Sequence, residues 1–445
     1  MKVFRCLYIP AAACLLLALA APSSYAQNVS ADELHQIIDQ QSEALFEQVV
    51  EWRRHFHENP ELSNRETETA AYVADYLRSL GMEVQTGVAH TGVVGILEGG
   101  RPGPVVGLRA DMDALPVTER VDVPFASTKT TTFLGQEVGV MHACGHDTHV
   151  AMLMGVARIL TDMKEQLPGT VKFIFQPAEE GAPPGEEGGA ELMVEEGVLE
   201  NPEVDVIFGQ HIDSDTPVGK LNYRPRGSMA AADRFVITVH GKQTHGSTPW
   251  TGVDPIVTSA QIINGLQTIV SRQTELTKAA AVISVGKISG GVRNNIIPES
   301  AEMIGTIRTL DPEMKTIIHE KIRHTATTIA ESMGATAEVE IELGVPVTYN
   351  DPELTQQMLP SLQQAAGGGE NVILEDAITG AEDFSFFQQQ VPGLYIFIGG
   401  MPADMDPANA TPHHTPDFYI DESGMRLGVR SLAYLAVDYM LSHAD

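Results

Sequence analysis

The order of the apolar runs along the chain changes once, near its middle, and this change constrains the fold more than any other feature. On both sides of the change, short apolar runs alternate with segments of helical periodicity, which predicts a mostly parallel sheet of the α/β class. Between residues 226 and 343 the predicted order is instead β-α-β-β-α-β, as in a ferredoxin-like sandwich. Because that order is complete in itself, we predict a satellite domain inserted into a discontinuous catalytic domain.

The predicted division is a signal peptide at 1–26, a catalytic domain at 27–225 and 344–445, and a satellite and dimerisation domain at 226–343. Strands of the catalytic domain are predicted at Val93–Leu97, Val105–Leu108, Val171–Phe175, Val204–Phe208 and Leu394–Ile398, and its helices at Ala70–Leu80, His146–Met163, Gly189–Glu196, Asp351–Ala366, Ala381–Gln389 and Asp421–Ser442. Strands of the satellite are predicted at Phe235–Val239, Ala280–Ile288, Ile296–Ile307 and Ala335–Ile341, and its helices at Asp254–Arg272 and Pro312–Met333. Ser63 and Glu66 are predicted to form a capping box before the first helix.

The N-terminus has the features of a secretory signal peptide. Lys2 and Arg5 precede an apolar run from Ile9 to Ala21, and a small-residue site that ends at Ala26 follows. The run is too short to span a bilayer, so a membrane anchor is the less favoured alternative. We therefore predict cleavage after Ala26 and export to the periplasm or the medium.

Cysteine content and charge exclude several classes of protein. The signal peptide contains Cys6 and Cys14, so only Cys144 remains after cleavage and the fold is not held by an internal disulfide. The formal net charge is −31, and such a surface repels nucleic acid and anionic lipid. We therefore expect neither a nucleic acid nor, after cleavage, a membrane as a partner.

Polar clusters follow four of the predicted strands, where open α/β sheets form their sites. They are Arg109–Asp113, Gln176–Gly181, Gly209–His211 and a loop that ends at His413–Pro416, and a fifth cluster, His142–His149, opens a helix. Each alone has an ordinary explanation: a strand-end histidine is usually hydrogen-bonded, adjacent glutamates usually form a solvated turn, and a lone cysteine is usually a small buried residue. Together they supply thiolate, imidazole and carboxylate, which suits zinc or a neighbouring transition metal, and their number suits two ions better than one.

The adjacent Glu179 and Glu180 permit a division of labour. One carboxylate can bind metal while its neighbour accepts a proton from metal-bound water. A metal lowers the pKa of that water to about 7, so a carboxylate can act as general base at neutral pH.

Three motifs resemble those of a known family: Leu108–Pro116 (LRADMDALP), Met141–Asp147 (MHACGHD) and Gln176–Gly181 (QPAEEG). They closely resemble the amidohydrolase branch of the aminoacylase/carboxypeptidase-type co-catalytic metallopeptidases, which includes hippurate hydrolase, N-acyl-L-amino-acid amidohydrolases and auxin-conjugate hydrolases. Further motifs match at Gly241–Ser247, Gly305–Arg308, Gly380–Phe384 and His414–Pro416. The resemblance covers nearly all of the chain after the predicted signal peptide.

The resemblance implies roles for residues of the catalytic domain. The implied ligands of two divalent ions (zinc, manganese or similar) are Cys144, His146, Glu180, His211 and His414. Glu179 is the implied general base, and Asp113 is implied to orient a neighbouring ligand or the catalytic machinery. His413 is the alternative to His414.

The resemblance also implies roles for residues of the satellite. His245 is implied to reach the site of the partner subunit in a homodimer and to stabilise the oxyanion of the tetrahedral intermediate. Asn294 and Arg308 are implied to bind the free carboxylate of the substrate. The alternatives are that Asn294 serves a turn and that Arg308 forms a surface ion pair.

The predicted function is hydrolysis of the amide bond of N-acyl amino acids (N-acetyl, N-benzoyl or similar) by a metal-bound hydroxide, with Glu179 as general base. A dipeptidase or carboxypeptidase of the same family is the first alternative. A thiol hydrolase with Cys144 as nucleophile and a non-enzymatic metal- or peptide-binding protein are the others. The segment Ala182–Gly188 looks longer than the linker usual in the family and is predicted to reshape the substrate pocket.

Overall fold

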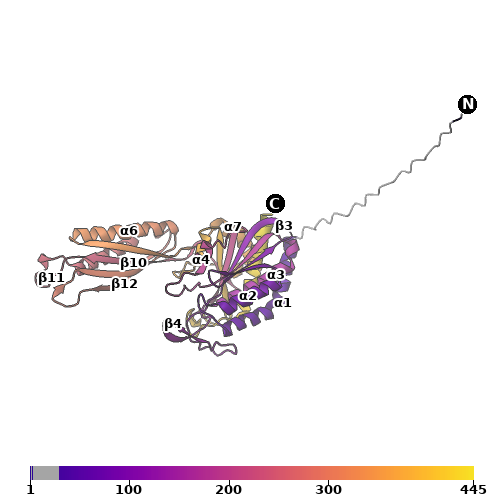
Figure 1. The fold of residues 1–445 in the computed structure, drawn as a ribbon, viewed down its shortest axis with the longest axis horizontal. Helices are drawn as coiled ribbons and strands as arrows, with labels where there is room; N and C mark the ends of the chain where they lie inside the picture. The colour runs from indigo at the N-terminus through magenta and orange to yellow at the C-terminus, as the bar shows by residue number, and fades with distance from the viewer. Residues whose placement is uncertain (2, 4–29, 445) are drawn as a thin grey trace.

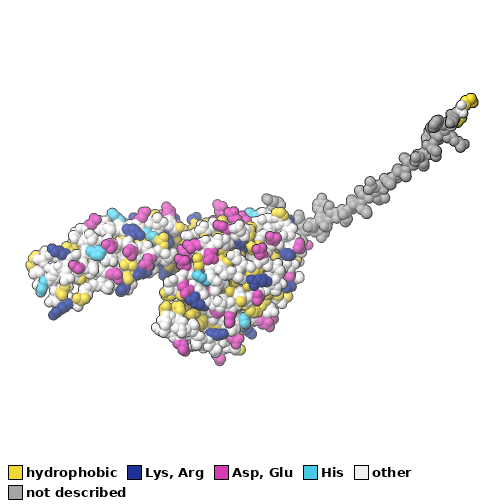
Figure 2. Space-filling model, in the orientation of Figure 1, with side chains coloured by type: hydrophobic (Ala, Val, Ile, Leu, Met, Phe, Trp, Pro, Cys, Tyr) yellow, Lys and Arg dark blue, Asp and Glu magenta, His cyan; other side chains and the backbone are white. Residues whose placement is uncertain are grey.

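The computed structural model describes residues 1, 3 and 30–444 and shows two units, a larger catalytic unit and a satellite that projects from it (Figure 1). The predicted signal peptide, apart from residues 1 and 3, lies outside the described residues, so export stays a prediction. Among the described residues, no helix combines the length and the apolar character needed to cross a membrane. Acidic side chains are spread over both units on the face in Figure 2, as expected from a charge distributed along the chain.

An eight-stranded sheet forms the centre of the catalytic unit, in the order β1-β2-β6-β3-β7-β18-β8-β17. The four middle strands, β6, β3, β7 and β18, run parallel to one another, whereas β2 is antiparallel to β6 and β8 is antiparallel to β18. The strands are β1 (Glu83–Val88), β2 (Gly92–Glu98), β3 (Arg101–Asp111), β6 (Pro168–Gln176), β7 (Val206–Pro217), β8 (Leu221–Tyr223), β17 (Val372–Leu374) and β18 (Gly393–Met401). The predicted mostly parallel sheet is confirmed.

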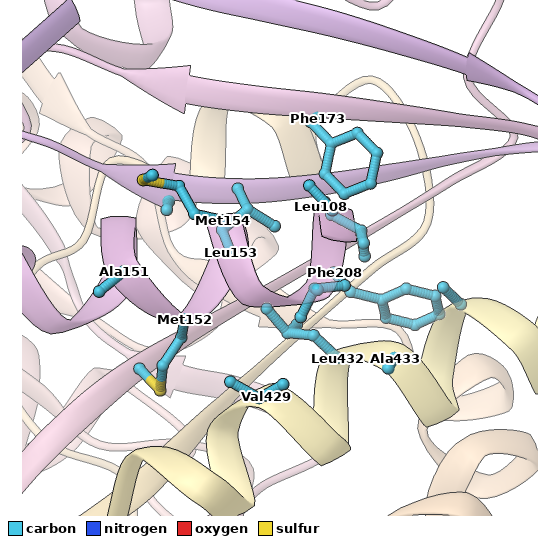
Figure 3. Packing of buried hydrophobic residues seen from close by; sticks show 14 of the residues in the cluster. Leu108, Ala151, Met152, Leu153, Met154, Phe173, Phe208, Val429, Leu432 and Ala433 are labelled. Carbon is cyan, nitrogen blue, oxygen red and sulfur yellow. The ribbon is translucent and has the colours of Figure 1, made fainter. Parts of the chain in front are cut away.

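Helices cover both faces of this sheet. One apolar cluster joins the sheet to α1 (Ala31–Glu58), α2 (Thr67–Ser79), α3 (His146–Asp162), α7 (Pro352–Ala365) and α9 (Met425–Ser442), and a second joins it to α4 (Gly189–Glu195) and α8 (Ser385–Gln388). Phe173 of β6 and Phe208 of β7 belong to the first cluster, while their chain neighbours Ile174 and Ile207 belong to the second. Because successive strand residues point to opposite faces, both faces are buried, which explains the continuous apolar runs. Figure 3 shows α3 and α9 packed on the first face.

The long helix α1 was not among the elements predicted from the sequence. Its start carries a capping box: the hydroxyl of Ser30 accepts from the backbone amide of Glu33, and the carboxylate of Glu33 accepts from the backbone amide of Ser30. Its buried stripe, which includes Leu34, Ile38 and Phe56, packs against α3 and α9. Apolar residues recur at helical spacing among polar ones, so the sequence carried the signal for this amphipathic helix.

The capping box predicted at Ser63 and Glu66 is wrong. The carboxylate of Glu61 instead accepts hydrogen bonds from the backbone amides of Glu68 and Thr69, at 2.8–3.1 Å, and so caps α2. The side chains of Ser63 and Glu66 make tertiary hydrogen bonds toward the candidate site. The two residues have the spacing of a capping box, but their side chains hydrogen-bond to residues that are distant in the sequence.

Two other predicted elements differ from the structure. The helix predicted at Ala381–Gln389 is reduced to α8, because Glu382 and Asp383 use their carboxylates to bind the guanidinium of Arg109 before the helix begins. The strand predicted at Ile296–Ile307 is divided into β13 (Ile296–Ile297) and β14 (Ser300–Thr309). Pro298 lies between them and has no backbone N–H to donate to a sheet.

The satellite contains a four-stranded antiparallel sheet in the order β12-β14-β10-β15. Its elements are β10 (Ala231–His240), α5 (Pro255–Gln273), β12 (Ala281–Gly290), β14 (Ser300–Thr309), α6 (Pro312–Ser332) and β15 (Thr336–Val345), and the helices pack on the sheet through one apolar cluster. This confirms the inserted β-α-β-β-α-β order. The sheet begins at Ala231 instead of 226, because β9 (Arg226–Met229) pairs with β16 (Thr348–Asn350), where the chain returns to the catalytic unit.

Candidate metal centre

The carboxyl ends of the parallel strands bring the predicted ligands of the catalytic unit together. Glu180 follows β6, His211 lies in β7, and His414 lies in the loop after β18. Cys144 and His146 flank Gly145, which has a φ of 95° and opens α3. This left-handed conformation favours glycine, and a Cβ there would lie 2.3 Å from Ile212, so the turn that separates the two side chains requires glycine.

The thiol of Cys144 lies at the centre of the group. Its Sγ is 3.4 Å from Nε2 of His211 and 3.2 Å from Nε2 of His414. Cys144 belongs to two sets of side chains whose ligand atoms could surround an ion, one with His146 and His211 and one with Glu180 and His414. The two sets share only Cys144, which is the arrangement expected where a thiolate lies between two ions.

The chemistry of this donor set fits metal ions. Nε2 of His146 is buried and has no hydrogen-bond partner among the described residues, although buried polar atoms are almost always paired. The Oε1 atom of Glu180 lies 4.0 Å from it and 3.0 Å from Nε2 of His414. Sulfur, imidazole nitrogen and carboxylate oxygen converge on one buried space, as zinc and related metals prefer.

Three further groups of side chains are close enough to hold an ion: His146 with Glu179 and Glu180, and two groups whose members are already hydrogen-bonded to one another or to neighbours. In the first of these two, Nδ1 of His149 lies 2.5 Å from Asp111, and its Nε2 accepts from the amide of Ile212. In the second, which contains Glu179, Glu382 and Asp383, the guanidinium of Arg109 donates to the last two. Nε2 of His146, by contrast, has no hydrogen-bond partner among the described residues and lies 3.8 Å from Glu179 and 4.0 Å from Glu180.

Backbone carbonyls fix the rings of His146 and His211. Nδ1 of His146 lies 2.9 Å from the carbonyl oxygen of Asp113, and Nδ1 of His211 lies 2.6 Å from that of Ile212. A carbonyl can only accept, so each Nδ1 carries the hydrogen and each Nε2 presents a lone pair to the cavity. This is the tautomer that a metal ligand needs.

The carboxylate of Asp113 holds the two glutamates by their backbones. Its oxygens accept from the amides of Glu179, at 3.1 Å, and Glu180, at 3.0 Å. Oδ1 of Asp113 is also 3.3 Å from Nδ1 of His146. Asp113 thus lies where it can orient both a proposed ligand and the loop with the proposed base.

Crowded, buried anions shift the titration of this cluster. Burial, followed by the charges of Glu382 and Glu180, raises the pKa of Glu179 well above its usual value. Burial and then the charge of Glu180 likewise raise the pKa of the Cys144 thiol. A cation relieves such repulsion, so the electrostatics agree with the donor set.

His414, not His413, occupies the central position. Nδ1 of His413 is 3.6 Å from the sulfur of Cys144, but its Nε2 accepts from the amide of Ser214. Nε2 of His414 faces both Cys144 and Glu180. The geometry therefore favours the histidine that the sequence analysis preferred.

The structure does not bring His245, Asn294 and Arg308 to this cluster within one chain. His245 is exposed on β11 (Thr244–His245), at the far end of the satellite from the catalytic unit (Figure 1). Asn294 is exposed in the loop before β13, which pairs with β11. Arg308 lies at the opposite end of β14, where Thr309 pairs with Ala231 at the start of the satellite. The length of β14 separates the two ends by roughly 30 Å.

The segment Ala182–Gly188 borders the site. Pro183 and Pro184 line a cavity of about 580 Å³ that Glu180 also lines. The carboxylate of Glu186 binds the guanidinium of Arg65 with two bonds of 3.0 and 2.6 Å, which fastens the segment beside the loop before α2. A second cavity, of about 600 Å³, opens on the other side of Glu180 and also contains Cys144.

Sequence reasoning assigned no role to several residues that support the site. Arg109 is fully buried and donates to Gln176, Asp111 and the Glu382–Asp383 pair. His149 accepts from the backbone amide of Ile212 in β7, and its spacing of three from His146 on a helix was a usable signal that both face the same side. Glu66, which hydrogen-bonds to the loop with Glu179, gave no such signal.

Comparisons with known proteins agree with this geometry. Residues 107–438 match the model of a family described as peptidase family M20/M25/M40. The chain is 43% identical over 393 residues to thermostable carboxypeptidase 2 of Saccharolobus solfataricus, an alignment that covers 88% of this chain and 95% of that protein. It is 37% identical over 396 residues to N-acetylcysteine deacetylase of Bacillus subtilis, covering 88% of this chain and 97% of that one. A solved structure from Bacillus subtilis, described as a dinuclear metal binding peptidase from the M20 family, superposes with a TM-score of 0.74 at 34% identity, covering 90% of this chain and 99% of that one.

Proposed function

Because this chain belongs to peptidase family M20/M25/M40 and is a metal-dependent hydrolase of amide bonds, we propose that it cleaves the amide bond of N-acyl amino acids. One observation carries the proposal: Cys144 is shared by two sets of ligand atoms, with the carboxylate of Glu179 beside them. The deacetylase relative supports an acyl amino acid as substrate. The carboxypeptidase relative supports the second candidate, cleavage of a peptide next to its free carboxylate.

The proposed ligands are Cys144, His146, Glu180, His211 and His414, which together would hold two divalent ions such as zinc or manganese. When bound, the ions supply Lewis acidity, which polarises the amide carbonyl and promotes ionisation of the attacking water. Glu179, whose Oε2 lies 3.8 Å from Nε2 of His146, accepts the proton of that water and returns it to the leaving amine. Asp113 keeps the loop with Glu179 in place through its backbone.

We propose that a second copy of the chain completes the site. His245 of the partner subunit would stabilise the oxyanion, because the chain's own His245 lies at the far end of the satellite. Arg308, near the start of the satellite, would bind the substrate carboxylate in its own subunit, and Asn294 of the partner subunit would assist. Arg308 lies at one end of β14, and His245 and Asn294 lie near the other, so one subunit does not bring all three to the same site. This separation supports a contribution from two subunits.

A hydrolysis screen tests the proposed function. We expect purified, metal-loaded protein to cleave N-acetyl or N-benzoyl amino acids, to lose activity on chelation, and to regain it with added zinc or manganese, measured by release of free amine. Turnover of peptides alone would favour the carboxypeptidase candidate. Activity that survives chelation but not alkylation would favour a Cys144 thiol hydrolase, and no turnover at all would contradict the proposal.

The reactivity of Cys144 gives an independent test of the metal site. We expect the thiol to resist iodoacetamide while the ions are bound and to react after chelation, because coordination draws electron density from the sulfur and limits access to it. The residue is 8% exposed, so the chelated protein should be compared with protein unfolded in urea, which gives the full reaction. Mass spectrometry of the Cys144 peptide gives the extent of labelling. Rapid labelling with both ions retained would show that Cys144 is not a ligand.

A further inference from the structure

The loop that carries Glu179 passes through an unfavourable backbone conformation. Ala178 has a φ of 54°, in the left-handed region that residues with a Cβ rarely occupy, and it is buried. For a residue other than glycine this conformation is disfavoured about tenfold relative to the right-handed one. Some interaction in the fold must therefore stabilise this backbone conformation of Ala178. The same conformation sets the direction in which the next side chain, Glu179, points.

Glu66 provides that hold. One carboxylate oxygen accepts from the backbone amide of Ala178 at 2.9 Å, and the other accepts from the hydroxyl of Thr91 at 2.6 Å. Glu66 stands at the N-cap position of α2 but makes no side-chain cap there, because Glu61 caps that helix. The carboxylate is thus committed to a loop that lies 112 residues away in the sequence.

Three successive backbone amides of the loop donate hydrogen bonds to two buried carboxylates. The amide of Ala178 donates to Glu66, and those of Glu179 and Glu180 donate to Asp113. We propose that Glu66 is a positioning residue, which holds Ala178 in the left-handed conformation and so directs the carboxylate of Glu179 toward the reacting water. The inference rests on the proposed role of Glu179 as general base.

The electrostatic cost of Glu66 supports a role beyond packing. The side chain is fully buried, and both of its hydrogen-bond donors are neutral. Burial, followed by the nearby charge of Asp113, raises its pKa to about 7. An apolar side chain would fill the same space without this penalty, so what the carboxylate adds is its pair of hydrogen bonds.

Two substitutions at position 66 separate the hydrogen bond from the charge. Glu66→Ala removes the acceptor, and we expect kcat to fall by about tenfold to hundredfold, since small misplacements of a catalytic group have effects of this size. KM and the content of two ions per subunit should change little, because Glu180 stays bound to Asp113. Glu66→Gln keeps an oxygen for Ala178, and the Thr91 hydroxyl can rotate to accept from the new amide, so kcat should remain near that of wild type.

A second substitution tests the mechanism of the effect. Ala178→Gly makes the left-handed conformation easy to adopt without any acceptor. In the double variant Glu66→Ala/Ala178→Gly we expect recovery of part of the kcat lost in Glu66→Ala. A merely structural role of Glu66 predicts that any recovered kcat only follows a recovered fraction of folded protein, which circular dichroism of the same samples measures.

Hydrogen–deuterium exchange gives a readout that needs no substrate. We expect the peptide with Ala178 to exchange slowly in wild type and in Glu66→Gln, and faster in Glu66→Ala, while peptides of the satellite stay unchanged. Faster exchange with an unaltered kcat, or a loss of kcat that neither glutamine nor the glycine variant restores, would overturn the proposal. If wild type does not turn over acyl amino acids, the proposed function is contradicted instead. Even then, unaltered exchange in Glu66→Ala would show that Glu66 does not stabilise the loop at Ala178.

Discussion

Glu179→Gln should lower kcat by about 10²–10⁴, the usual contribution of general acid–base catalysis, while both ions remain bound. Glutamine keeps the shape of the side chain and leaves every proposed ligand in place, but it cannot accept the proton of the attacking water. The backbone amide of Glu179 still donates to Asp113, so the loop should keep its position. Steady-state kinetics and elemental analysis of the same preparation measure the two effects.

Glu180→Gln is the matched control, because it makes the same chemical change one residue along the same loop. Oε1 of Glu180 faces His414 and belongs to one of the two sets around Cys144. This variant should therefore lose metal as well as activity. If both variants lose metal equally, or if Glu179→Gln loses metal and Glu180→Gln does not, the assignment of base and ligand is wrong.

His245→Ala should lower kcat by about 10²–10³, the usual effect of removing one oxyanion donor, without loss of metal. The physical reason is that His245 lies at the far end of the satellite from its own catalytic unit, so in the proposed dimer it would act on the site of the partner. The control is His324→Ala, which removes another exposed histidine of the satellite, on α6. That variant should keep wild-type activity.

Mixing two inactive variants tests whether His245 acts between subunits. In a dimer of His245→Ala with Glu179→Gln, one site carries both changes and the other carries neither. Random exchange of equal amounts should therefore restore up to about a quarter of wild-type activity, since half of the dimers are mixed and each has one intact site. Co-purification of differently tagged subunits verifies the exchange. Verified mixed dimers without activity would show that His245 serves its own subunit or has no catalytic part.

The sequence determined those features of this protein that depend on local order and residue type. The alternation of strands and helices, and the complete β-α-β-β-α-β segment within it, predicted the parallel sheet and the inserted satellite, since apolar periodicity reflects which faces are buried. The clusters at strand ends predicted that Glu180, His211 and His414 would lie at one edge of the sheet, because the carboxyl ends of parallel strands share one edge, whereas the ligand roles of all five residues came from the family resemblance.

Tertiary structure decided which partner each polar side chain takes. Ser63 and Glu66 have the spacing of a capping box, but Asp113 and Ala178, distant in the sequence, are the groups that they bind. The separation of His245 from the metal centre likewise follows from how the satellite projects, which no motif encodes. A hydrogen bond between distant residues depends on the packing of whole elements, and local spacing carries no information about that packing.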